Sequence, residues 1–149
     1  MSVNTVCNHN VATIDLDEDF VKAAERMRQT HVGNLIVVER RGAYEFPVGI
    51  ITDRDIVVGI IAKRISPESI KGSDAVKPNL VTVHKDSGIE AALREMRRAG
   101  VRRAPVVGDE GELIGVLSID DVIDHLAVQL GHIAEIIRLE QHIESRERS

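Results

Sequence analysis

Two stretches of the chain repeat one another, and this repeat restricts the fold more than any other feature of the sequence. Residues 11–38 align without a gap with residues 80–107 at an offset of 69, and eight of the 28 aligned pairs are identical. After a surplus of three residues in the first copy, the register resumes at an offset of 66, where Gly49–Asp55 aligns with Gly115–Asp121. Two related copies predict one pseudo-symmetric body rather than two unrelated domains.

Each copy has the same local pattern. A short apolar strand (11–14 or 80–83) precedes an amphipathic helix that begins near Asp17 or near Ser87, where Ser87–Glu90 reads as a capping box. Two apolar strands joined by a turn rich in glycine and charge follow, and they indicate a hairpin. A second helix begins after Thr52 or Ser118. The sequence therefore predicts an α/β (α+β) fold made of two β-α-β-β-α repeats plus a C-terminal helix.

The division of the chain follows from this repeat. We expect repeat 1 at residues 3–62, a polar linker at 63–75, repeat 2 at 76–130 and a C-terminal amphipathic helix or tail at 131–149. Gly100 is expected to end the helix of the second copy, with His31 in its place in the first. A unit of about 60 residues buries little surface alone, so we expect the copies to share a core across their interface.

The C-terminal segment belongs to neither copy. From Asp120 to about Arg146 there is no proline, and Leu126, Leu130, Ile133 and Ile136 form a stripe of helical period. Such a stripe must be covered. The helix either folds back on its own body or meets a partner, most simply a second copy of the chain.

Composition and charge exclude several classes of protein. Only 2% of the residues are aromatic and the net charge is −5, which argues against stacking on single-stranded nucleic acid and against phosphate neutralisation. One cysteine, Cys7, permits neither an intrachain disulfide nor a multi-thiolate zinc site. No apolar run is long enough for a membrane span and no signal region begins the chain, so we expect a cytoplasmic protein with no membrane or nucleic-acid partner.

Candidate catalytic groups are few. Cys7 stands two residues before His9, but no third group is evident that would orient the pair, and a small buried cysteine is the simpler interpretation. The six histidines lack metal-ligand spacing and are expected at the surface. A P-loop, Gly-x-Gly-x-x-Gly and Gly-x-Ser-x-Gly are all absent. We expect no enzyme activity, no metal and no catalytic residue.

A repeated Thr/Ser-x-x-Asp motif is the best candidate for binding. Thr52 with Asp55 and Ser118 with Asp121 each follow an apolar strand directly. One interpretation is a helix cap, in which the hydroxyl accepts from backbone N–H groups. The other is a corner where a strand end and a helix N-terminus meet a phosphate, while the carboxylate accepts from a ribose diol.

Together these features resemble a stand-alone bacterial or archaeal pair of cystathionine β-synthase (CBS) domains, also called a Bateman module. The resemblance rests on the two β-α-β-β-α copies, on Val101–Val107 with its relative Val32–Val38, and on the two Gly-x-x-Thr/Ser-x-x-Asp ends. It covers roughly residues 3–130. It implies two clefts between the repeats for adenosine-containing ligands and association into a homodimer.

The resemblance also assigns site residues. It places Ile50, Thr52, Arg54, Asp55, Val81, Val101, Arg102 and Arg103 in a first cleft, and Ala12, Val32, Gly33, Asn34, Val116, Ser118 and Asp121 in a second. It implies that the two aspartates hold ribose hydroxyls and that Thr52 and Ser118 hold phosphate. Aliphatic side chains would then enclose the adenine.

The two clefts are expected to differ in charge. The first combines Arg54, Arg102 and Arg103, whereas the second has Asp120 in place of Arg54 and neutral Gly33-Asn34 in place of the arginine pair. Since a carboxylate near a phosphate is unfavourable, we expect the first cleft to bind AMP, ADP or ATP more tightly.

We therefore expect a regulatory adenine-nucleotide sensor in signal transduction, with no obligatory cofactor. Two alternatives remain open. One is a structural or adaptor dimer with vestigial clefts, and the other is a sensor of NAD or S-adenosylmethionine. A protein partner is compatible with all three, and the sequence does not name it.

Overall fold

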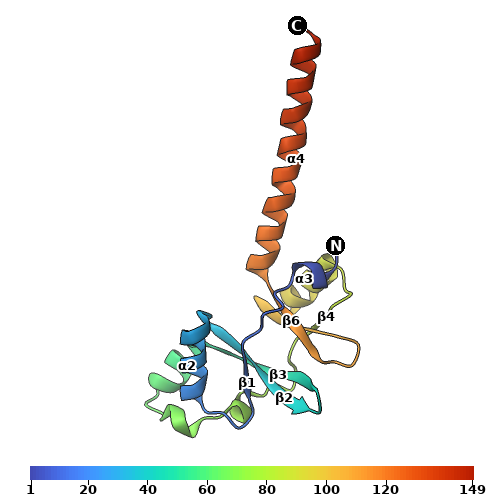
Figure 1. The fold of residues 1–149 in the computed structure, drawn as a ribbon. Coiled ribbons are helices and arrows are strands. Elements are labelled where there is room, and N and C mark those ends of the chain that lie inside the picture. Colours follow the sequence, from blue (N-terminus) through green and yellow to red (C-terminus); the bar gives the residue numbers. More distant parts are fainter.

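The computed structural model describes all 149 residues and contains the two predicted repeats. Repeat 1 consists of β1 (Thr13–Asp15), α2 (Phe20–Thr30), β2 (Asn34–Arg41), β3 (Tyr44–Thr52) and η1 (Asp55–Ile61), a π-helical segment. Repeat 2 consists of β4 (Val83–His84), α3 (Ile89–Ala99), β5 (Arg103–Val107), β6 (Leu113–Ser118) and α4 (Ile119–Glu147). The predicted β-α-β-β-α order and the α/β fold class are confirmed (Figure 1).

Each repeat has a mixed three-stranded sheet with the same register. The order is β1-β2-β3 in one sheet and β4-β5-β6 in the other, with the first pair parallel and the second antiparallel. Ile14 pairs with Val37, and their equivalents Val83 and Val106 pair likewise. Residues that the offset of 69 aligns in the sequence therefore also occupy equivalent positions in the strand pairing. The surplus residues of the first copy lengthen the β2–β3 hairpin, which turns at Gly42 with a φ of +61°.

Helix ends agree with expectation at the C-terminus and differ at the N-terminus. His31 and Gly100 both adopt the left-handed conformation that ends α2 and α3. The N-cap of α2 is Asp19, whose side chain accepts from the backbone N–H of Lys22 at 2.9 Å. In α3 the N-cap is Gly88, without any side-chain cap, so the capping box predicted at Ser87 is wrong.

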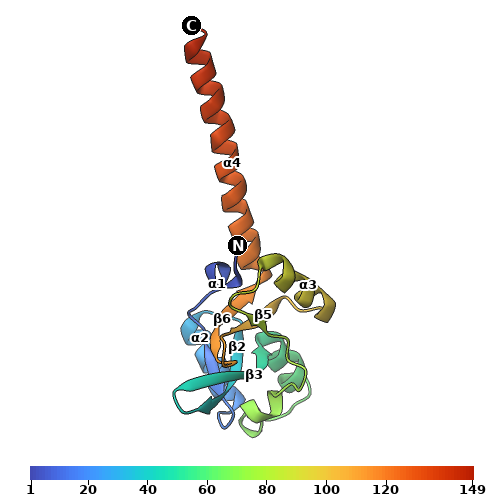
Figure 2. The same ribbon diagram turned by 90° about the vertical axis from the view of Figure 1, so that its right-hand side faces the viewer.

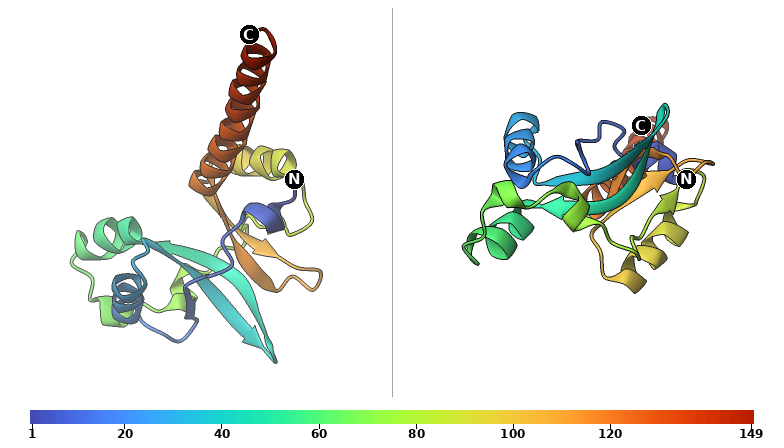
Figure 3. Two further views of the ribbon diagram at one scale, coloured as in Figure 1. Left: turned by 45° about the horizontal axis from the view of Figure 1, so that its top comes forward. Right: turned by 90° about the horizontal axis from the view of Figure 1, so that it is seen from below.

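The buried side chains form two clusters, one in each repeat. Repeat 1 has its cluster around Ile14, Leu35 and Ile51, and repeat 2 has its own around Met96 and Leu117. Each repeat thus has a core of its own. Ile36 and Val38 are also fully buried but belong to neither cluster, because they alternate along β2 with Leu35 and Val37 and lie on the other face of the sheet. The two bodies meet where β3 lies against β6, with the helices of repeat 1 and α3 at opposite ends of the molecule (Figure 3).

Each repeat also receives a short segment from outside its own β-α-β-β-α unit. The N-terminal helix α1 (Val3–Val6) packs on repeat 2, where Val3 and Cys7 join the core and the Val3 N–H donates to the Ser87 carbonyl at 2.8 Å. The 3₁₀ turn η3 (Gly72–Ala75) packs on repeat 1, where the Gly72 N–H donates to the Glu18 carbonyl at 2.9 Å. With the preceding turn η2 (Pro67–Ser69), the polar segment at 63–75 is therefore largely held against repeat 1.

The last helix leaves the body. Val122 at its base is 4% exposed and belongs to the core of repeat 2, but most of the following residues lie at the surface. Figures 1 and 2 show α4 as a straight stalk that points away from both repeats. The alternative in which this helix folds back on its own body is wrong.

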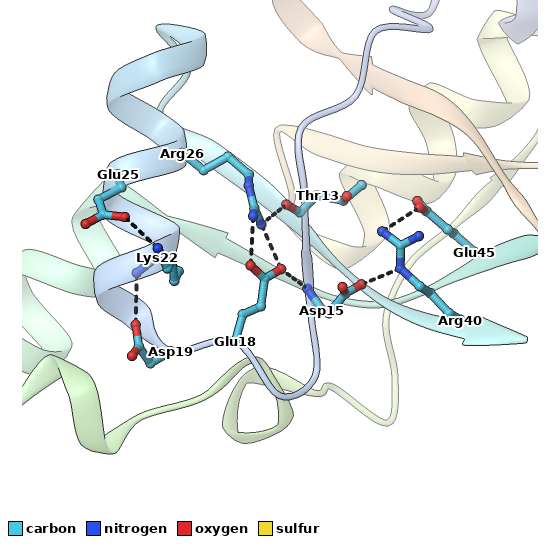
Figure 4. A network of polar contacts seen from close by, with 9 residues as sticks. All are labelled: Thr13, Asp15, Glu18, Asp19, Lys22, Glu25, Arg26, Arg40 and Glu45. Carbon is cyan, nitrogen blue, oxygen red and sulfur yellow. Dashed lines mark hydrogen bonds and ion pairs between the residues drawn. The ribbon is translucent and has the colours of Figure 1, made fainter.

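Repeat 1 contains a network of charged side chains that repeat 2 lacks (Figure 4). Arg26 donates to both carboxylate oxygens of Glu18, at 2.8 and 2.7 Å, and to the carbonyl of Thr13 at 2.8 Å. Glu18 also accepts from the backbone N–H of Asp15 at 3.0 Å. The hydrogen bonds from Arg26 are the main reason that the pKa of Glu18 falls to about 2. At the offset of 69, the equivalents of Glu18 and Arg26 are Ser87 and Glu95, which cannot form this pair.

Candidate functional site

The first predicted cleft exists as a cavity between the repeats. It has a volume of about 290 Å³ and is lined by Ile50, Thr52, Asp55, Lys77, Val101, Arg102 and Arg103. A neighbouring cavity of about 160 Å³ shares Ile50, Lys77, Val101 and Arg103 with it and adds Asn79, Leu80, Val81 and Ala99. Together the two cavities bring together seven of the eight residues expected here. Aliphatic and cationic side chains thus line two adjoining cavities.

Thr52 and Asp55 hold one another at the end of β3. The Asp55 N–H donates to the Thr52 hydroxyl oxygen at 3.1 Å, and the Thr52 N–H donates to a carboxylate oxygen of Asp55 at 2.9 Å. This is the reciprocal cap that the motif suggests. The second carboxylate oxygen of Asp55 has no partner within the chain, and neither has the hydroxyl hydrogen of Thr52. The cap therefore leaves one acceptor and one donor for a ligand.

Arg54 lies outside this cavity. It lines a neighbouring hollow of about 360 Å³ with Phe20, Val58 and Ile70, and Asp55 lines both hollows. The three arginines expected in the first cleft therefore do not line one cavity together. Lys77, which the sequence interpretation missed, supplies the third positive charge next to Arg102 and Arg103.

The second predicted cleft is smaller and less charged. Its volume is about 130 Å³, and its lining consists of Asn8, Asn10, Val11, Ala12, Val32, Asn34, Arg103, Val116, Ser118 and Asp121. Six of the seven expected residues are present. The Ser118 hydroxyl donates to Asp121 at 2.7 Å and accepts from the Asp121 N–H at 3.1 Å. Unlike Thr52, Ser118 therefore has its hydroxyl hydrogen already engaged.

Two residues expected at the second cleft lie elsewhere. Gly33 is outside the lining; its carbonyl accepts from the Asp53 N–H at 2.9 Å, and an added Cβ would come within 2.9 Å of the Asp53 carboxylate. Asp120 is also outside the lining, and its carboxylate lies 3.8 Å from the Arg102 guanidinium, which belongs to the first cleft. The carboxylate expected to weaken the second cleft is instead beside the first.

Four of the lining residues that sequence reasoning missed follow one rule. Asn8 and Asn10 of the second cleft correspond at the offset of 69 to Lys77 and Asn79 of the first. These residues lie in the segments that lead into β1 and β4, and the aligned repeat was not extended that far. Extending the same offset by three residues would have identified all four.

Cys7 and His9 are close but do not form an activated pair. The Cys7 sulfur is 3.7 Å from His9 Nε2, while that nitrogen lies 3.0 Å from the Asn4 carbonyl. Burial raises the pKa of the Cys7 thiol, and the nearby carboxylate of Asp121 adds to the effect. A thiol with a raised pKa is a poor nucleophile at neutral pH. Cys7 is buried, as the sequence interpretation expected.

One group of possible metal ligands lies on the surface of repeat 2. The ligand atoms of His84, Asp86 and Asp109 lie within 4.8 Å of one another. His84 Nε2 is 3.1 Å from Asp109, its Nδ1 accepts from the Asp86 N–H at 3.2 Å, and Lys85 lies 3.3 Å from Asp109. The ammonium of Lys85 is the main reason that the pKa of Asp109 is lowered. Hydrogen bonds and an ion pair within the chain account for this cluster.

Comparison with known families decides the classification. The CBS domain model matches residues 3–62 and 73–128, which is most of the chain. The chain is a tandem CBS-domain protein. Among curated relatives, this CBS pair is 31% identical over 123 residues to the uncharacterized protein MK0525 of Methanopyrus kandleri, covering 83% of the chain and 61% of the relative. It is 35% identical over 130 residues to the mitochondrial CBS domain-containing protein CBSX3 of Arabidopsis thaliana, with 86% and 61% covered. The chain thus spans about three fifths of the length of these relatives.

Solved structures share the fold of this CBS pair. The CBS domain protein PAE2072 from Pyrobaculum aerophilum, complexed with AMP, has a TM-score of 0.71 at 24% identity, with 81% of this chain and 89% of that chain covered. The CBS domain pair of MJ0100, in complex with 5'-methylthioadenosine and S-adenosyl-L-methionine, has a TM-score of 0.72 at 20% identity, with 87% and 98% covered. A hexameric CBS-CP12 protein from bloom-forming cyanobacteria has a TM-score of 0.70 at 27% identity, with 83% and 69% covered.

None of the helices of this CBS pair combines the length with the apolar content that crossing a bilayer requires.

Proposed function

We propose that this CBS pair is a non-catalytic sensor that binds an adenine nucleotide (AMP, ADP or ATP) in the cleft between its repeats. The observation that carries the proposal is the first cleft itself. Three cationic residues, Lys77, Arg102 and Arg103, line one cavity with a single carboxylate, Asp55, and with aliphatic walls. The family to which the chain belongs and the adenosyl ligands of two structural relatives support the same ligand class.

Each part of the ligand has a chemically matched group. The free carboxylate oxygen of Asp55 suits the hydroxyls of a ribose, and the Thr52 hydroxyl hydrogen suits a phosphate oxygen. The guanidinium groups of Arg102 and Arg103 and the ammonium of Lys77 suit the charge of one or more phosphates. Ile50, Val81 and Val101 suit the faces of an adenine. In the second cleft, Asp121 and aliphatic residues would play the same parts with less positive charge, whereas the Ser118 hydroxyl hydrogen already donates to Asp121.

A route from the cleft to the C-terminal helix supports a role in signalling. The Arg102 carbonyl accepts from the N–H of Ile119, the first residue of α4, at 3.0 Å, and the Arg102 side chain lies 3.8 Å from Asp120. A phosphate that attracts the Arg102 guanidinium therefore competes with Asp120 on the first turn of α4. Such competition alters α4 only to the extent that the ligand binds the two arrangements with different affinity.

Isothermal titration with AMP, ADP, ATP, NAD and S-adenosylmethionine, together with thermal unfolding, tests the proposal. We expect one of the three adenine nucleotides to bind most tightly. At 100 times its dissociation constant it should stabilise the fold by about 2.7 kcal/mol. If NAD or S-adenosylmethionine binds most tightly, the protein would still be a sensor, but its ligand would be that compound rather than an adenine nucleotide. No binding by any of the five at millimolar concentration would contradict the proposal and favour an adaptor dimer with vestigial clefts.

We propose further that this sensor acts as a homodimer. The hexameric state of one structural relative supports self-association as a property of proteins with this fold. We infer no obligatory cofactor and no metal.

A further inference from the structure

Beside the first cleft, repeat 1 has a further hollow to which the proposed function assigns no ligand. Its volume is about 360 Å³, and its lining comes from the first residue of α2, from η1, and from the segment that contains η2 and η3. This volume lies at the lower end of the range for ligand pockets, which suits a small molecule. Charged and apolar side chains both line it, so a ligand can make two kinds of contact there.

The apolar part of the lining is preformed. Phe20 and Ile60 belong to the core cluster of repeat 1 and are 5 and 9% exposed, and Ile70 packs against that cluster. The Phe20 N–H donates to the Ile70 carbonyl at 2.9 Å, which joins the start of α2 to the segment that carries Asp74. Gly59 contributes no side chain, and nothing lies within 4 Å of a Cβ built on it. The hollow therefore combines a fixed apolar surface with open space.

Three charged side chains line the same hollow. The guanidinium of Arg54 makes no hydrogen bond or ion pair within the chain. Asp55 and Asp74 each accept one backbone N–H at 2.9 Å, from Thr52 and from Lys71, through one carboxylate oxygen. No ion pair joins Arg54 to either carboxylate. Opposite charges thus line one hollow without neutralising one another.

This combination matches one class of ligand. A guanidinium binds a carboxylate through two parallel hydrogen bonds, and a free carboxylate oxygen binds an ammonium group. A ligand that carries both charges can therefore lie between Arg54 and Asp74. An aliphatic side chain on the same ligand gains from contact with the apolar lining, because apolar surface is removed from water. A free aliphatic α-amino acid carries all three groups on one small molecule.

We propose that this hollow binds a free α-amino acid with an aliphatic side chain, such as leucine. Arg54 holds the α-carboxylate, Asp74 holds the α-ammonium group, and Phe20, Ile60 and Ile70 contact the side chain. The proposal does not rest on nucleotide binding, and it gives the CBS pair a second kind of ligand. Since Asp55 lines both hollows, this ligand lies directly beside the first cleft.

Isothermal titration with L-leucine and with analogues that each lack one group tests the proposal. 4-Methylpentanoate lacks the ammonium group, 3-methylbutylamine lacks the carboxylate, and glycine lacks the side chain. We expect L-leucine to bind at millimolar concentration or below. Each analogue should bind at least about tenfold more weakly, because it loses a charge-assisted hydrogen bond or the apolar contact. An analogue that binds as tightly as L-leucine would overturn the assignment of the group that it lacks.

Methyl NMR shows where the amino acid binds. Ile60 and Ile70 line the hollow, whereas Ile50 lines the first cleft. In the absence of nucleotide, L-leucine should shift the δ1-methyl resonances of Ile60 and Ile70 and leave that of Ile50 unchanged. A shift at Ile50 alone would place the amino acid in the first cleft and overturn the proposal, whatever the outcome of the nucleotide titrations.

Matched variants test the two charged contacts. Arg54→Gln and Asp74→Asn should each weaken the binding of L-leucine at least about tenfold. Arg28→Gln and Asp17→Asn remove the same charges from exposed positions of repeat 1 outside the hollow, and they should change the affinity by less than about twofold. All four positions are exposed, so thermal unfolding should show a folded body in each variant.

Two results would contradict the proposed site. One is a wild type that does not bind L-leucine at millimolar concentration. The other is an equal change of affinity in each variant and its control, which would show that the overall charge of repeat 1, and not the hollow, determines binding.

Discussion

The two clefts occupy equivalent places in the two repeats and yet differ in size and charge. In the first, Lys77, Arg102 and Arg103 face Asp55 across a cavity of about 290 Å³. In the second, Arg103 faces Asp121 across about 130 Å³, and Asn8 and Asn34 stand where the first cleft has Lys77 and Arg103. The strand pairing and the motif that positions the aspartates are the same in both. Duplication has thus preserved the scaffold, while changes at a few lining positions set the chemistry of each cleft.

Other parts of the two repeats also share a scaffold but differ in its detailed contacts. Each repeat accepts a segment that precedes the first strand of the other, and each has a glycine where that segment approaches its hairpin. A Cβ on Gly49 would overlap the carbonyl oxygen of Ala75, and one on Gly115 would lie 2.7 Å from the carbonyl oxygen of Asn8. The approach of backbone is therefore closer at Gly49 than at Gly115, and substitution of each glycine measures its effect on stability.

The largest effect on stability is expected from the first of these glycines. Gly49→Ala should lower the free energy of unfolding by about 3 kcal/mol, and Gly115→Ala by about 1–2 kcal/mol, because the closer approach to backbone must be relieved by a larger shift. Urea unfolding measures both values. Gly59→Ala is the control, since nothing lies within 4 Å of its added Cβ. A greater loss for Gly115→Ala than for Gly49→Ala would reverse the comparison.

The next largest effect is expected in nucleotide affinity, which should depend more on the first cleft than on the second. Asp55→Ala should weaken the tightest binding of AMP by about 30-fold, which corresponds to the loss of a charge-assisted hydrogen bond. Asp121→Ala should change that affinity by less than about threefold. Isothermal titration of both variants provides the measurement. Equal losses would mean that the difference in charge between the clefts does not determine affinity.

The charged network of repeat 1 predicts that stability depends on pH through the Glu18–Arg26 pair, which has no equivalent in repeat 2. The pKa of Glu18 is lowered from 4.5 to about 2 in the folded chain. A lowered carboxyl pKa stabilises the fold fully above pH 4.5, and this contribution is lost as the pH falls from 4.5 toward 2. Glu18→Gln should therefore cost about 1–2 kcal/mol at pH 7, after allowance for solvent screening.

Urea unfolding of wild type and Glu18→Gln at pH 7, 4 and 3 tests this effect. The difference between the two proteins should shrink at the lower pH values. Glu25→Gln is the control, because its pair with Lys22 is exposed at the surface, and it should be neutral. A difference that stays constant with pH would show that the ionised Glu18–Arg26 pair is not its source.

The smallest expected difference concerns the helix caps. Asp19→Ala should cost about 1 kcal/mol, since Asp19 caps α2 through the Lys22 N–H. Ser87→Ala should cost almost nothing, because Gly88 caps α3 without help from a side chain. Thermal unfolding of the two variants distinguishes these values. If the two variants lose equal stability, Ser87 does cap α3, as the sequence suggested.

Much of the fold could be predicted from the sequence because its signals are local or repeated. The period of Phe20, Ala23 and Met27 indicates α2, and the glycine at position 100 ends α3, since each depends on near neighbours in the chain. The offset of 69 transfers one strand register to the other. Of the fifteen site residues that the family resemblance implied, thirteen line the two clefts, seven in the first and six in the second.

The tertiary structure decided what depends on contacts between distant segments. Lys77 reaches the first cleft because the segment before β4 packs on repeat 1, where the Lys77 N–H donates to the Val48 carbonyl at 2.9 Å. Arg54 lines another hollow and Asp120 lies near Arg102, and neither position follows from local sequence. The direction of α4 could not be predicted from the sequence pattern either. An apolar stripe requires a covering surface but does not specify one, and the packing of Ile119 and Val122 on the core of repeat 2 sets the direction in which the helix leaves the body. Periodicity thus determined which residues form each element, whereas long-range packing determined what those elements face.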